Sequence, residues 1–102
     1  MMITVDKNNT ALKLTLSGRL DTTTAPELEK VITAQTDGVT ELEIDMEKLE
    51  YISSAGLRVL LGAKKRMDAA SGTLTVSHVC DEIMEVFEMT GFSDILNIKL
   101  EV

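Results

Sequence analysis

The sequence is poor in the residue types from which most small catalytic and metal centres are built. Its 102 residues include a single cysteine, Cys80, and a single histidine, His78. One thiol cannot form an internal disulfide, and one Cys with one His two positions away provides too few ligands for a zinc site. We therefore expect no disulfide, no bound metal and no cofactor.

Long apolar segments are also missing. The chain contains no run of 18 apolar residues, and its first residues, Met1 to Asp6, have neither a basic region nor a long apolar core. Such runs are the sequence signs of membrane spans and of secretory signal peptides. The expected protein is therefore soluble and cytoplasmic, without membrane insertion.

Basic residues are outnumbered by acidic ones. The sequence has 10 Lys and Arg against 17 Asp and Glu, and its formal net charge is −7. Nucleic acids and anionic membranes repel such a chain on average, so a protein partner is favoured over nucleic acid. With 44% hydrophobic and 26% charged residues, the composition is that of a globular protein. We expect a single domain, residues 1–102.

Motifs for nucleotide binding and serine hydrolysis are absent. Neither G-x-x-x-x-G-K-[ST] nor G-x-G-x-x-G occurs. A serine hydrolase needs a general base, and His78 is the sole histidine, whereas the segment Ser53-Ser54-Ala55-Gly56 lacks the leading glycine of a nucleophile elbow. These observations argue against hydrolysis, and we expect no catalytic residue.

Hydrophobic periodicity is the strongest positive signal in the chain. Apolar residues at helical spacing predict three helices, the first opened by a capping box of Thr24 and Glu27 and the second running to about Ala70. The third begins near Cys80 and is expected to end at a glycine stop, Gly91. Period-two alternation predicts five strands, at residues 3–6, 11–17, 39–46, 73–79 and 95–102.

The order of these elements predicts the fold class. Strand, strand, helix, strand, helix, strand, helix, strand is typical of an α/β protein, because neighbouring parallel strands need crossover connections. We therefore expect one mixed β-sheet of four to five strands covered by helices. The last segment is expected to be an edge strand.

The segment that follows Tyr51 and Ile52 contains the candidate site. Ser53 or Ser54 falls at or beside the N-cap of the second helix, where backbone N–H groups lack partners and the helix dipole is positive. A phosphate on such a serine would meet these N–H groups. Ala55, which follows, adds little bulk. The residues themselves leave two interpretations open, a serine that only caps its helix and a serine presented to another molecule.

Two further pairs of residues also allow alternative interpretations. Leu57 and Leu61 lie four positions apart and partly outside the core stripe of the helix, so they indicate either a wide core face or an exposed ridge for a partner. Asp21 and Asp45 are each expected at a strand end, where α/β proteins often place functional groups, or they are ordinary turn acids.

Taken together, four motifs in this order resemble a STAS domain of the anti-sigma factor antagonist type. They are Gly18-Arg19-Leu20-Asp21; Ile44-Asp45; Tyr51-Ile52-Ser53-Ser54-Ala55-Gly56-Leu57 with Val59-Leu60-Leu61 after it; and Met89-Thr90-Gly91-Phe92.

The resemblance implies a bacterial regulator of transcription without enzymatic activity. In that family the unphosphorylated antagonist binds an anti-sigma factor that is also a serine kinase, and a sigma factor is released. The kinase phosphorylates a serine at the start of the helix after the third strand, and a serine phosphatase reverses the modification. The resemblance places this phosphorylation at Ser54. The family usually has Asp before that serine and Ser or Thr after it, whereas this sequence has Ser53 and Ala55, so Ser53 is the second choice.

The resemblance and the residue pattern together predict a partner-binding surface on a protein expected to be a monomer. Its residues are Asp21, Asp45, Ser53, Ser54, Ala55, Gly56, Leu57 and Leu61. The alternative function is that of a STAS subunit in a membrane-associated transport complex, in which the serine is not phosphorylated and serves only as a cap.

Overall fold

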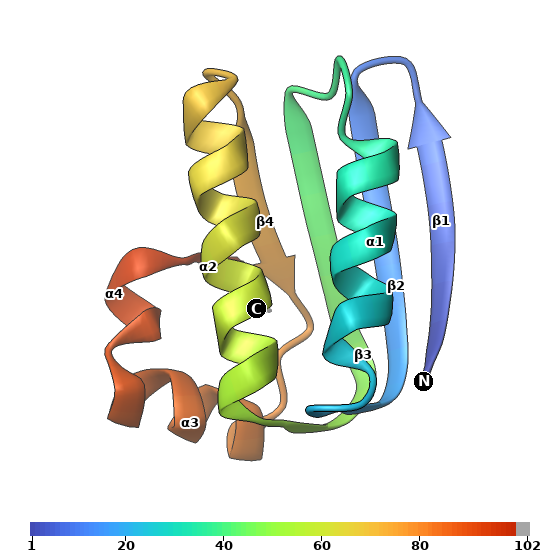
Figure 1. Cartoon of the computed structure of the whole chain (residues 1–102). Helices are drawn as coiled ribbons and strands as arrows, with labels where there is room; N and C mark the ends of the chain where they lie inside the picture. Colours follow the sequence, from blue (N-terminus) through green and yellow to red (C-terminus); the bar gives the residue numbers. More distant parts are fainter. Residues whose placement is uncertain (100–102) are drawn as a thin grey trace.

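The computed structural model describes residues 1–99, which form one five-stranded sheet and four helices (Figure 1). The elements are β1 (Met2–Asn8), β2 (Ala11–Leu20), α1 (Ala25–Gln35), β3 (Glu41–Ile52), α2 (Ser54–Ala69), β4 (Thr73–Ser77), α3 (Asp81–Thr90), α4 (Phe92–Ile95) and β5 (Asn97–Lys99).

The sheet is mixed, as the sequence predicts. Its strands lie in the order β1-β2-β3-β4-β5; β1 pairs with β2 antiparallel, and the other neighbours pair in parallel. The predicted α/β fold and the predicted order of strands and helices are confirmed, and β5 is an edge strand. The short helix α4 was not predicted. Residues 100–102 of the predicted last strand lie outside the described residues.

The two faces of the sheet differ in character. Helices α1 and α2 lie side by side on one face (Figure 1), and the core beneath them is built from alternate strand residues such as Leu14, Ile44 and Val76, all fully buried. The opposite face is polar and carries a shallow hollow of about 400 Å³, lined by side chains that include Lys13 and Glu43. Among residues 1–99, no helix combines the length and apolarity needed to cross a membrane.

Strand β3 is longer than its pattern predicts. The alternation stops at Met46 because two irregularities in the pairing with β2, at Thr15/Ser17 and at Gly18/Arg19, each leave an extra residue in β3. The strand nevertheless continues to Ile52. The prediction that Asp45 ends a strand is therefore wrong, because Asp45 lies in the middle of β3.

The start of α1 also differs from its prediction. Thr24 is the N-cap, but its side chain makes no capping bond, so the predicted capping box with Glu27 does not form. Instead the Thr24 hydroxyl accepts a hydrogen bond from the Asp21 N–H (2.9 Å) and donates one to the Arg19 carbonyl (2.8 Å). The hydroxyl therefore stabilises the loop before the helix.

At the end of α3 the predicted glycine stop is confirmed, because Gly91 has a φ of 82° in the left-handed region.

Candidate functional site

Ser53 fixes the point at which β3 turns into α2. Its backbone is extended, and its Oγ accepts a hydrogen bond from the Gly56 N–H (3.4 Å), as an N-cap side chain does. Its own N–H donates to the Leu20 carbonyl (2.9 Å), which ties the start of α2 to the end of β2. The polar groups of Ser53 thus serve the fold, and the residue is only partly exposed.

Ser54 has a different environment from its neighbour. It is the first residue of α2 and is exposed. The first turn of α2 is uncharged, and the exposed Arg58 lies one turn further along the helix. The positive end of the helix dipole and this guanidinium both favour an anion at Ser54. Residue 54 is therefore accessible to another protein and electrostatically suited to a phosphate.

The backbone behind Ser54 packs closely against the sheet. Gly56 is buried, and a Cβ placed on it would lie 2.7 Å from Leu20 Cγ and 3.0 Å from Ile52 Cγ1. Only glycine allows this approach of α2 to β2 and β3. Leu57 belongs to the core with 6% exposure, whereas Leu61 is half-buried. The interpretation of both leucines as an exposed ridge is therefore wrong for Leu57, because the core face of α2 is wide.

A model of the STAS domain family matches residues 2–102 of the chain. The chain belongs to the STAS domain family. BtrV of Bordetella bronchiseptica, which is named as an anti-sigma factor antagonist, is 38% identical over 96 residues, covering 93% of this chain and 83% of BtrV. The anti-sigma-B factor antagonist of Staphylococcus aureus is 33% identical over 85 residues, covering 82% and 79%. The resemblance inferred from the sequence motifs is confirmed at the level of this family.

Solved structures show the same fold at low sequence identity. The anti-sigma factor antagonist SpoIIAA in its unphosphorylated form has a TM-score of 0.78 at 16% identity, covering 99% of this chain and 90% of SpoIIAA. Its phosphorylated form from Bacillus has a TM-score of 0.76 at 18% identity, covering 98% and 93%.

In this STAS domain Asp21 organises the loop beside the serines. One of its carboxylate oxygens, Oδ1, accepts hydrogen bonds from the Thr23 hydroxyl (2.8 Å), the Thr23 N–H (3.0 Å) and the Thr24 N–H (3.2 Å). The Thr23 hydroxyl, followed by the two backbone N–H groups, holds the pKa of Asp21 below its ordinary value. Because Leu20 bonds to Ser53, this loop and the start of α2 form one unit.

We expect Asp21→Ala to lower the thermal midpoint at neutral pH. Its hydrogen bonds favour the ionised carboxyl, so the pKa of Asp21 is lower in the folded than in the unfolded protein. The stabilising contribution is present above the unfolded pKa, about 3.9, and is lost as the pH falls through the folded pKa. Thermal melts of wild type and Asp21→Ala should therefore converge below about pH 4. As a control, Thr23→Val should raise the pKa of Asp21 in an NMR titration; an unchanged pKa would contradict this account.

Three residues of the site were not predicted from the sequence. The Arg19 guanidinium stacks 4.3 Å from the centre of the Tyr51 ring, and Arg19 Nε lies 3.9 Å from Asp21 Oδ2. Arg58, on the exposed side of α2, borders a hollow of about 260 Å³ between the first turns of α1 and α2. The expected strands end before Arg19 and Tyr51, and the two residues lie opposite one another only because of the irregular pairing between β2 and β3, so no local pattern signals this contact.

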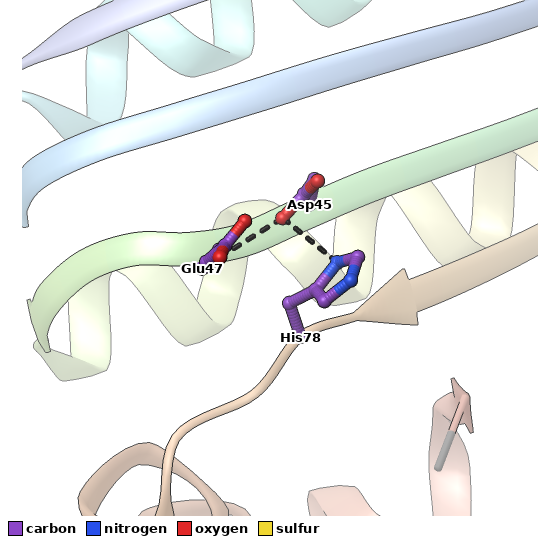
Figure 2. Close-up of side chains that lie close together, drawn as sticks. All are labelled: Asp45, Glu47 and His78. Atoms are coloured by element: carbon purple, nitrogen blue, oxygen red, sulfur yellow. Dashed lines mark hydrogen bonds and ion pairs between the residues drawn. The ribbon is translucent and has the colours of Figure 1, made fainter. Parts of the chain in front are cut away.

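Asp45 does not belong to this unit. It lies on the polar face of the sheet, where it is paired with Lys13 and His78, while Ser54 lies at the start of a helix that covers the other face. The structure therefore brings together Asp21, Ser53, Ser54, Ala55 and Gly56 and leaves Asp45 in a separate cluster (Figure 2).

Proposed function

We propose that this protein is an anti-sigma factor antagonist regulated by phosphorylation at Ser54. In its unphosphorylated form it binds an anti-sigma factor with serine kinase activity, and a sigma factor is released. Transfer of a phosphoryl group to Ser54 prevents binding, and a serine phosphatase restores it. The names of the curated relatives support the antagonist function, and the observation that carries the regulatory step is the exposed Ser54 at the first position of α2.

Ser54 is a better acceptor than Ser53 for structural reasons. A kinase must reach the Oγ and withdraw it from any competing bond. The Ser53 Oγ already accepts the capping bond from Gly56, and the residue is half-buried. Phosphorylation of Ser53 would therefore disturb the start of α2, whereas a phosphate on Ser54 projects into solvent.

The proposed partner surface follows one stripe of α2. Ser54, Arg58 and Leu61 are spaced by four and three residues, so they share a face of the helix. The exposed ring of Tyr51 and the half-buried Ala55 extend this surface at the start of the helix. A partner that contacts Leu61 and the hollow beside Arg58 therefore covers the Ser54 hydroxyl.

The residues behind the stripe support it without facing the partner. Leu57 packs in the core, Gly56 allows the close approach of α2 to the sheet, and Ser53 caps the helix. Asp21 holds the adjoining loop.

Phosphorylation acts on the interface more than on the fold. The phosphate adds about 1.5 to 2 negative charges at one atom. Within the domain, the N–H groups of the first helical turn and Arg58 stabilise these charges. At a closed interface the same dianion loses its hydration, and the partner has no groups arranged to bind it. Binding is lost while the domain keeps its structure.

We expect the kinase to label wild type and Ser53→Ala but not Ser54→Ala. The physical reason is the difference in accessibility between the two hydroxyl groups. The measurement is incorporation of radioactive phosphate from ATP with the cognate kinase, followed by mass spectrometry of the peptide that contains both serines. Label that persists in Ser54→Ala and disappears in Ser53→Ala would assign the acceptor to Ser53.

Co-purification from the native host tests the function itself. The tagged Ser54→Ala form, which stays unphosphorylated, should retain an anti-sigma factor of the kinase type. Recovery of a transport ATPase subunit in its place would contradict the proposal and would favour the alternative function as part of a membrane-associated transport complex.

A further inference from the structure

A separate cluster of possible metal ligands lies on the polar face of the sheet. Asp45 and Glu47 come from β3, and His78 follows the last residue of β4 (Figure 2). One ligand atom from each of the three side chains lies within 4.8 Å of the others. The sequence pattern does not reveal this cluster, because the two carboxylates come from a neighbouring strand and stand 31 or more positions before His78 in the chain.

An unusual backbone conformation brings His78 to this face. Ser77 pairs with Asp45 across the sheet, and its hydroxyl donates to Glu43 on the polar face (2.8 Å). Strict alternation would turn the next residue toward the core. His78 instead has a φ of 55°, in the left-handed region that few residues other than glycine adopt, and its imidazole contacts Asp45. Such strained conformations are often found at functional sites.

The distance between the first two ligand atoms fits a shared ion. His78 Nδ1 lies 3.2 Å from Asp45 Oδ1. Two ligands that each bind one zinc ion at about 2.0–2.1 Å in tetrahedral geometry are separated by about 3.3 Å. The second carboxylate oxygen of Asp45, Oδ2, lies 3.6 Å from Lys13 Nζ. One oxygen is thus directed toward a cation of the protein and the other toward the imidazole.

We propose that Asp45, Glu47 and His78 form a binding site for a divalent transition metal ion of the zinc class. The imidazole favours zinc, nickel or iron over magnesium and calcium, and two carboxylates complete a charged three-ligand set. The Asp45 side chain is 8% exposed and is held by the Glu47 N–H, whereas the exposed Glu47 carboxylate closes the site by rotation. Water occupies the remaining coordination positions. The ion links β3 to the segment that leads into α3.

Isothermal titration calorimetry with zinc chloride, in a chelator-free buffer at pH 7.5, tests the site. Wild type should show one saturable site. His78→Asn should bind at least about tenfold more weakly, since even changes outside the ligand set cost that much in affinity. Asparagine tolerates the left-handed backbone, so this variant keeps the local fold. Glu47→Gln changes an exposed side chain and should weaken binding without a loss of stability.

Two controls separate this site from other zinc-binding groups. Glu85→Gln removes an exposed carboxylate on α3, and Cys80→Ser removes the thiol near His78; both should bind zinc as wild type does. In NMR spectra, zinc should shift the ring signals of His78. The proposal is overturned if wild type shows no saturable binding up to millimolar zinc, if His78→Asn binds equally well, or if Cys80→Ser loses binding. None of these outcomes depends on a sigma factor or a kinase.

Discussion

Ser54→Asp is expected to weaken binding to the cognate anti-sigma factor by about a hundredfold, while Ser54→Ala binds about as tightly as wild type. A charge buried at an interface without a prepared partner costs several kcal/mol, and about 3 kcal/mol corresponds to a hundredfold or more in Kd. Alanine removes the acceptor but adds neither charge nor bulk. Calorimetric titration of the purified anti-sigma factor with each variant measures the difference.

The same substitution should slightly stabilise the isolated domain. An aspartate at the first position of a helix interacts favourably with the helix dipole, by about 0.3–1 kcal/mol. Weaker binding together with an equal or higher thermal midpoint would therefore show that the interface is changed and the fold is not. Loss of binding with a clearly lower midpoint would contradict the proposed mechanism.

Ser71→Asp is the matched control for this experiment. Ser71 follows the opposite end of α2, is exposed and has a left-handed backbone that aspartate tolerates. The net charge of the protein changes equally in the two variants, but the charge at residue 71 is distant from the proposed partner surface. Equal affinities of Ser54→Asp, Ser71→Asp and wild type for the anti-sigma factor would show that Ser54 lies outside the interface.

The two glycines of α2 should respond to alanine in opposite directions. Gly62 is exposed, and an added Cβ would meet nothing within 4 Å in the described part of the chain. Gly62→Ala should raise the free energy of unfolding by about 0.5–1 kcal/mol, the gain in helix propensity. Gly56→Ala makes the same gain, but its Cβ would lie 2.7 Å from Leu20 Cγ. Overpacking of this kind typically costs about 1–3 kcal/mol, and here we expect it to exceed the gain.

The expected difference between these two variants is about 2 kcal/mol, or about 10 °C in thermal midpoint for a domain of this size. Chemical denaturation monitored by circular dichroism measures the first value, and calorimetry the second. Because relief of the clash moves the first turn of α2, Gly56→Ala should also weaken partner binding, and Gly62→Ala should not. If Gly56→Ala were as stable as Gly62→Ala, the close approach of α2 to β2 would not be required.

Local patterns were enough to predict most of the elements and their order. The alternation in β2 and the glycine stop at Gly91 depend on residues close together in the chain, and both predictions are confirmed. The prediction of a capping box at Thr24 was wrong, although the residue pattern of a capping box is present in the sequence. The Asp21 carboxylate, three residues earlier, accepts the N–H of Thr24, and the Arg19 carbonyl accepts its hydroxyl. Propensity does not reveal such competition between nearby groups.

The sequence by itself determined the α/β class, the positions of the three longer helices and the presence of two serines at the start of α2, because these features depend on periodicity and on residue types a few positions apart. Only the tertiary structure decided that Ser54 is exposed while Ser53 caps the helix, that Leu57 is buried, and that Asp45 lies in mid-strand beside His78. These properties depend on which strands pair and in what register, since bulges in β3 and the left-handed backbone at His78 change where side chains point.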